Sequence, residues 1–185
     1  GTHRWDERSQ LLLIKVIAMA IADSRNDRRY VKVYHGLIEP LRRIASDADA
    51  DVDTRAEAIV AIASLRDRDG QIPDEALVAI LQVQWEVLKR RRMGDELVEG
   101  AISETLRKWV PLLSEDQREM LFRSVGRMSC DAPPILKDLK EETVSGGPRD
   151  IDRRGLDSFR SLVASLLDRD IPKESCPADR PRLSG

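Results

Sequence analysis

The densest cluster of potential metal ligands in this 185-residue chain is the acidic run DADADVD at residues 47–53. Its carboxylates alternate as they do in a twelve-residue Ca²⁺-binding loop, which also needs a glycine at position 6 and a glutamate at position 12. Counting from Asp47, those positions hold Val52 and Ala58, so both requirements fail. The run is therefore predicted to be a solvated turn that caps the following helix, and no metal or cofactor is expected.

The side chains that most often carry catalysis are few and scattered. The chain holds two histidines, His3 and His35, and two cysteines, Cys130 and Cys176. A catalytic nucleophile needs a base that a third group orients, and a structural zinc site needs four ligands, so neither arrangement is suggested. No catalytic residue is therefore assigned. His35, next to Gly36 at an expected helix break, is a candidate binding residue.

A run of cations could bind phosphate or an acidic partner. The run consists of Lys89, Arg90, Arg91 and Arg92. It also falls at the expected end of a helix, where cations complement the helix dipole. Trp85, one turn earlier, lies off the main apolar stripe of that helix, so it could face a groove or a neighbouring helix. These five residues complete the candidate binding set.

The composition and charge limit which partners and which cellular compartment are expected for this protein. The net charge of −2 argues against nucleic-acid binding by the whole domain, because such domains are normally basic. The longest apolar run, residues 11–21, is too short for a bilayer, which takes about 20 residues. Two cysteines form no disulfide framework, so a cytoplasmic or otherwise reducing compartment is predicted. Arginine supplies most of the basic residues, a skew typical of GC-rich bacterial genomes.

Residues 37–65 carry the clearest structural pattern, two apolar stripes of helical period on either side of the acidic run. The stripes are Leu37, Ile38, Leu41 and Ile44, then Val52, Ala56, Ile59 and Ala63. This stretch resembles one HEAT repeat, in which a first helix with an internal proline, an Asp-rich turn and an Ala-rich second helix follow each other. The residues in those places are Pro40, Asp47, Asp49, Arg55, Ala58, Ala61 and Ile62. Thr54 stands where the family usually has valine.

The resemblance implies a binding scaffold, since HEAT units stack into such scaffolds. It also implies a structural role for one arginine. In that repeat, the arginine at the place of Arg55 reaches the turn aspartates of its own or the adjacent unit. Asp47 and Asp49 lie one short turn upstream, so we expect Arg55 to bond to them.

The rest of the chain repeats this helical rhythm, and no sustained alternation indicates strands. Gly36 is expected to break the second helix and Pro40 to kink it, while Ser114 and Gln117 form a capping-box pattern. The first helix is apolar on most sides and should lie in the middle of a bundle. Helices are predicted over residues 5–22, 30–44, 52–65, 73–92, 95–113, 115–128 and 152–168, with a short helical piece at 135–139.

We therefore predict an all-α fold, a short HEAT-like stack of antiparallel helix pairs over residues 1–170, followed by a disordered tail at 171–185. An irregular helical bundle is the alternative. The predicted function is that of a scaffold that binds a protein partner through a helical face. The alternative is a helical effector enzyme, such as a ubiquitin-ligase-like module without a catalytic cysteine, acting on host proteins inside a host cell. An exposed His35 in a polar pocket would favour the enzyme.

Overall fold

The computed structural model describes residues 6, 8–9, 11–13, 15, 30–67, 69–90, 92–130, 132–134 and 151–172. Within these ranges the regular structure is helical and no β-strand occurs, so the all-α prediction is confirmed. The helices are α2 (Tyr30–Ser46), α3 (Val52–Ser64), α4 (Asp74–Lys89), α5 (Asp95–Trp109), α6 (Glu115–Ser129) and α7 (Arg153–Leu167). A short 3₁₀ helix, η1 (Val110–Leu112), follows α5 and contains Pro111, so the α-helix predicted over residues 95–113 ends at Trp109.

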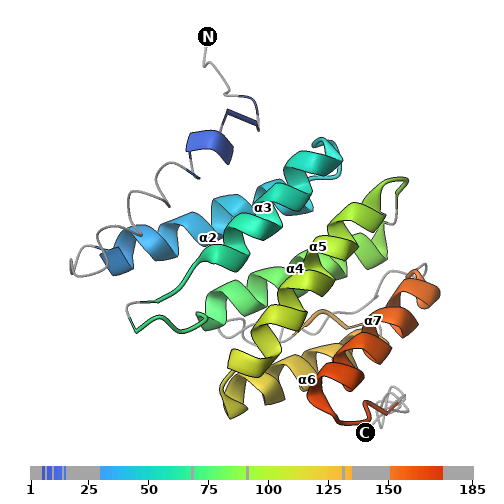
Figure 1. Ribbon diagram of the computed structural model, residues 1–185. Helices are drawn as coiled ribbons and strands as arrows, with labels where there is room; N and C mark the ends of the chain where they lie inside the picture. The colour runs from blue at the N-terminus through green and yellow to red at the C-terminus, as the bar shows by residue number, and fades with distance from the viewer. Residues whose placement is uncertain are drawn as a thin grey trace, which may run out of the picture.

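The helices pack as three consecutive pairs in two layers (Figure 1). Within the pairs, α2 contacts α3, α4 contacts α5, and α6 contacts α7. Between the pairs, α2, α4 and α6 follow one another in one layer, and α3, α5 and α7 follow one another in the other. The central helix α4 contacts all five of the others, so it organises the core.

The sequence of α4 explains this central position. Ten of its sixteen residues are buried, and they cover most of its circumference. A helix that is apolar nearly all round belongs in the interior. Asp74 and Glu75 occupy its first turn, where carboxylates complement the helix dipole, and Pro73 precedes them as the N-cap. One buried residue in this helix, Gln84, is polar.

Two predicted helix caps are present. At the start of α3, the Asp51 side chain accepts a hydrogen bond from the Thr54 backbone N–H at 3.2 Å. At the start of α6, the Ser114 hydroxyl accepts from the Gln117 backbone N–H at 3.2 Å, and the Gln117 side chain accepts from the Ser114 N–H at 3.1 Å. This reciprocal pair is the predicted capping box, which satisfies two otherwise unpaired donors.

The predicted break at Gly36 is wrong, because α2 runs without interruption through Gly36 and Pro40. A proline inside a helix costs about 3 kcal/mol, since it removes a hydrogen bond and crowds the carbonyl group one turn earlier. Here both residues lie on the exposed side of α2, where water can hydrate that carbonyl group. The opposite side buries four large apolar side chains, each worth about 1.5–3 kcal/mol. Burial on one face therefore outweighs the cost on the other.

The first predicted helix is described only in part. Residues 8–9, 11–13 and 15 are helical, and the Lys15 ammonium forms an ion pair with Glu57 of α3. Leu11 is buried, but Leu12 and Leu13 remain 58% and 49% exposed. The expectation that this helix lies in the middle of a bundle is therefore wrong for these residues. The helical piece predicted at residues 135–139 lies outside the described part of the chain.

The end of the described chain revises the predicted tail. The stripe of α7 buries Leu156, Phe159 and Val163 and half-buries Leu166. Ile171, the first residue of the predicted tail, is only 3% exposed and belongs to the hydrophobic core. Core packing therefore extends beyond residue 170, while residues 173–185 lie outside the described residues. None of the described helices combines the length and apolarity needed to cross a bilayer.

Candidate binding site

A buried ion pair joins the first two helix pairs. The Arg55 guanidinium of α3 donates from Nη1 to Asp95 Oδ1 at 2.6 Å and from Nε to the Ala45 carbonyl oxygen at 3.1 Å. The two charged residues are 5% and 2% exposed. The second Asp95 oxygen accepts from the Arg92 backbone N–H at 2.8 Å. Arg55 therefore bonds to the first residue of α5, in the next helix pair.

The expected bonds from Arg55 to Asp47 and Asp49 are absent from the described contacts, so that prediction is wrong. Asp47 accepts from the Asp49 backbone N–H at 2.9 Å and shapes the turn. Asp49 is exposed and pairs with the Arg92 guanidinium at 3.4 Å. Its carboxylate faces solvent, whereas Arg55 points into the interior.

Arg92 also connects the turns of the first two pairs, because it donates to the Ala48 carbonyl oxygen at 2.9 Å. Gly94 precedes α5 with φ +92°, and an added Cβ there would lie 3.6 Å from a Val52 methyl group. The two turns are therefore in close contact. We call the residues that bond across this contact the turn junction: Ala45, Ala48, Asp49, Arg55, Arg92 and Asp95.

The candidate binding residues predicted on α4 do not gather on one surface. Trp85 is 6% exposed and packs in the core. Lys89 pairs with Glu86 at 2.6 Å, and its ammonium lies 5.9 Å from the centre of the Trp85 ring. Arg90 is exposed at the end of α4, while Arg91 lies outside the described residues. His35 lies in α2, but its side chain is outside the described part of the chain.

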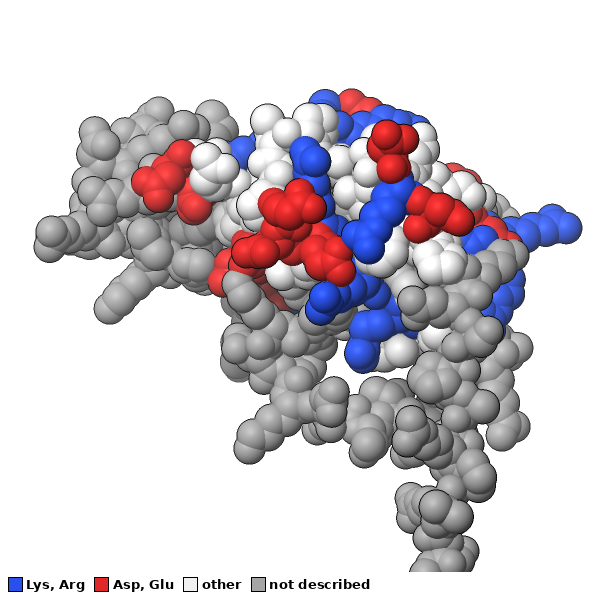
Figure 2. All heavy atoms as spheres, turned by 90° about the horizontal axis from the view of Figure 1, so that it is seen from below, with Lys and Arg blue, Asp and Glu red and all other residues white. Residues whose placement is uncertain are grey.

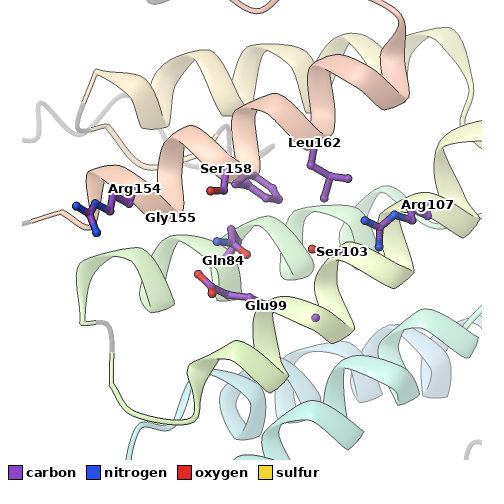
Figure 3. Close-up of a pocket in the computed structure, with 10 residues that line it drawn as sticks. Gln84, Glu99, Ser103, Arg107, Arg154, Gly155, Ser158 and Leu162 are labelled. Carbon is purple, nitrogen blue, oxygen red and sulfur yellow. The ribbon is translucent and has the colours of Figure 1, made fainter.

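A pocket of about 670 Å³ lies between α5 and α7, with a buried residue of α4 in its lining (Figure 3). This volume is in the range of small-ligand sites. Its lining combines hydroxyl, amide, charged and apolar groups: Gln84, Glu99, Gly100, Ser103, Arg107, Arg154, Gly155, Ser158, Phe159 and Leu162. None of the predicted site residues is among them.

The amide of Gln84 is the most unusual group in this pocket. The residue is 2% exposed, yet its side chain makes no hydrogen bond within the described part of the chain. Figure 3 shows the amide between α7 on one side and Glu99 of α5 on the other. In the described chain, the fully buried side-chain atoms without a hydrogen-bond partner are Ser46 Oγ and Arg118 Nε, so the Gln84 amide opens onto the pocket and is not sealed in the core.

Two glycines explain why α7 sits close to α4 while the space beside α5 stays open. A Cβ at Gly155 would lie 2.5 Å from the Asp152 carboxylate and 3.2 Å from a Leu88 methyl group, so a larger residue would force these side chains to shift. The contact is fixed by a hydrogen bond of 2.9 Å from the Asp152 N–H to the Leu88 carbonyl oxygen. A Cβ at Gly100, on the α5 wall, would meet no atom within 4 Å.

Cationic side chains stand at opposite ends of the pocket. In Figure 3, Arg107 of α5 extends toward the middle of the pocket, while Arg154 of α7 extends away from it. Neither guanidinium has an ion pair within the described ranges. Glu99 lies on the same wall as Arg107, two helical turns earlier, so the charged lining is predominantly basic.

One feature of the sequence indicates this site. Gln84 follows Leu77 and Leu81 and precedes Leu88 at the spacing of the buried stripe. An amide in a core stripe should have a partner, and the sequence of α4 offers none beside it. The other lining residues come from two helices far apart in the chain, so no local pattern could have grouped them.

The remaining chemistry of the described chain is sparse. No group of three or more histidine, cysteine or carboxylate residues in these ranges could hold a metal ion. Cys130, at the end of α6, is in a disulfide. Cys176 lies outside the described residues. Comparisons with protein-family models, curated proteins and solved structures found no match.

Proposed function

We propose that this chain is a short HEAT-like stack of helix pairs that acts as a scaffold and binds a protein partner through a helical face. The observation that carries the proposal is the Arg55–Asp95 bond at 2.6 Å. In the repeat that residues 37–65 resemble, the arginine at this place reaches the turn aspartates of its own or the adjacent unit. Arg55 reaches the adjacent pair, which supports a repeat in which each pair fixes the next.

The order in which the helices pack supports the same proposal. Alternate helices follow one another in each layer, as they do in stacked repeats. Such stacks expose equivalent helices side by side, which gives an extended surface for a partner. A buried ion pair adds little net stability, but it penalises any register that leaves one charge unpaired. The turn junction would therefore set how the first two pairs align.

Nucleic-acid binding has less support. On the face shown in Figure 2, acidic and basic side chains are intermixed and no extended basic area appears. Lys89 and Arg92 of the basic run are paired with Glu86 and Asp49. The enzyme alternative depended on the surroundings of the His35 side chain, which is not described, so no observation favours it. The predicted bacterial source and a location in a host cell stay predictions.

Affinity capture tests the scaffold proposal. The tagged chain is incubated with an extract of its native cells, and retained proteins are quantified by mass spectrometry against the tag alone. We expect at least one protein to be enriched and, once purified, to form a complex with the chain in analytical ultracentrifugation. If no protein is enriched, or if the enriched proteins fail to bind when purified, the proposal is wrong.

A further inference from the structure

We infer that the pocket between α5 and α7 binds a short, extended peptide segment that carries a side-chain carboxylate. This inference rests on the proposed scaffold function, because that function supplies the protein from which the segment comes. The stacking of helix pairs does not show where a partner binds or what chemistry it has, and the inference specifies both.

The Gln84 amide points to a peptide. Its side chain carries an N–H donor and a C=O acceptor. A backbone amide carries a C=O acceptor and an N–H donor, which can pair with them. The amide lines the pocket and makes no hydrogen bond in the described chain, so it is available to bond to a ligand there. A backbone amide placed against it would satisfy both of its hydrogen-bonding groups.

The dimensions of the walls suit an extended segment. The lining of α5 runs from Glu99 to Arg107, and that of α7 runs from Arg154 to Leu162. Each run covers eight residue steps, which at about 1.5 Å per residue gives roughly 12 Å. An extended chain rises about 3.3 Å per residue, so roughly four residues span the walls.

The charges and the apolar lining define the side chains of that segment. Arg107 reaches toward the middle of the pocket without an ion pair in the described ranges, so it can take a carboxylate in a charge-assisted bond. Phe159 and Leu162 line the α7 wall and offer contact to an apolar side chain. The preferred ligand therefore combines an acidic and an apolar residue within about four positions, from the wall length above.

Selection from a phage-displayed library of random heptapeptides tests this inference. The immobilised wild-type chain should enrich peptides with an aspartate or glutamate near an apolar residue. The most enriched sequence is then synthesised with an amidated C-terminus and titrated by fluorescence anisotropy. Binding of the amidated peptide identifies a side-chain carboxylate as the ligand, and binding only of the free acid would instead identify a chain terminus and overturn the inference.

Matched variants locate the site. Gly100→Leu fills the open space on the α5 wall, and Gly126→Leu on α6 is its control, because a Cβ at Gly126 also meets no atom within 4 Å. Gln84→Leu removes the amide, and Arg107→Gln removes the charge. We expect Gly100→Leu, Gln84→Leu and Arg107→Gln each to weaken binding by about 10-fold or more, and Gly126→Leu to change it less than about 2-fold.

Each other outcome overturns the inference in a defined way. Failure to enrich any peptide, or enrichment of peptides without acidic residues, excludes the proposed ligand. Peptides that bind the Gly100→Leu and Gln84→Leu variants as tightly as wild type lie elsewhere on the surface. In those cases a partner captured from the native extract would still support the scaffold, so the two proposals fail separately.

Discussion

The two sides of α5 differ in how completely their polar groups are paired. On the side that faces α3, Arg55 and Asp95 are buried, and their charged groups bond to each other and to backbone groups of the neighbouring turns. On the side that faces α7, the pocket is lined by the Gln84 amide, which makes no hydrogen bond in the described chain, and by two arginines without an ion pair there. One side is closed by its own residues, and the other is left open.

This difference separates groups that hold the fold together from groups available to a ligand. Removing a partner at the closed side leaves a charge buried and unpaired, so the cost appears in the free energy of unfolding. Removing a polar group at the open side takes away a group that the fold does not use, so the cost should appear in binding.

Arg55→Ala should destabilise the chain by about 3–5 kcal/mol, because it leaves the Asp95 carboxylate buried without its cation. This exceeds the roughly 1–2 kcal/mol that a partly shielded bond to the turn aspartates would contribute. Chemical denaturation measures the loss. The matched control is Arg123→Ala, which breaks an exposed pair with Glu119 on α6 and should cost less than about 1 kcal/mol.

The double variant Arg55→Ala/Asp95→Ala sharpens this test. With both charges removed, the loss should be well below the sum of the two single losses, since the residues are in direct contact. Additive losses would show that the pair does not act as a unit, and the closed side would then need another explanation.

Ile171→Ala should destabilise the chain by about 2–5 kcal/mol, the usual cost of truncating a buried isoleucine. The side chain follows α7 and anchors the helix that forms one wall of the open side. Thermal or chemical denaturation measures the effect, with exposed Leu112→Ala as the control. A loss no larger than that of the control would place residue 171 in the tail, as the sequence predicted.

Gln117→Leu should destabilise the chain by about 1–3 kcal/mol, because this buried glutamine is fully bonded. Its amide nitrogen donates to the Ile72 carbonyl oxygen at 2.7 Å and to Asp74 at 2.9 Å, and its oxygen accepts from the Ser114 N–H. Chemical denaturation again gives the loss. A change below about 0.5 kcal/mol would mean that water replaces these bonds without cost.

Glu39→Gln should have the smallest effect, and the effect should depend on pH. Hydrogen bonds from Arg42, opposed by burial and aided by a bond from Arg43, lower the pKa of Glu39 from 4.5 to about 2. The contribution of Glu39 is therefore fully present above about pH 4.5 and is lost as the pH falls toward 2. The Glu39 carboxylate is half exposed, so its contribution to the free energy of unfolding should be below about 1 kcal/mol.

Urea unfolding near pH 6 and near pH 3 measures this contribution. Wild type should lose more stability than the Glu39→Gln variant between the two conditions. Equal losses would show that solvent screens the contact completely.

The sequence predicted the helices well, because their signals are local. The stripe of α6 and its capping box lie within one helix, and so do the acidic first turn and apolar stripe of α4. The predictions failed where residues far away in the sequence determine the local structure. Nothing near Arg55 in the chain indicated Asp95, which lies 40 residues away, as its partner. Pro40 is tolerated because other helices cover the opposite face of α2.

The candidate site was missed for the same reason. Gln84 comes from α4, whereas Arg107 and Ser158 come from α5 and α7, and only the packing of three helices brings them to one pocket. The basic run was conspicuous in the sequence, but Lys89 pairs with Glu86 on its own helix and Arg92 pairs with Asp49 in the turn of the first helix pair. A polar residue within an apolar stripe was the better indicator of a site than a run of charge.

The most direct test of the division between closed and open sides is the stability of Gln84→Leu, measured by chemical denaturation beside Gln117→Leu. Both substitutions replace a buried amide with an apolar group of similar size. The account predicts that Gln84→Leu is as stable as wild type or more stable, by up to about 1 kcal/mol, because no bond in the described fold is lost. A loss of about 1 kcal/mol or more, as expected for Gln117→Leu, would show that the Gln84 amide serves the fold and would contradict the account.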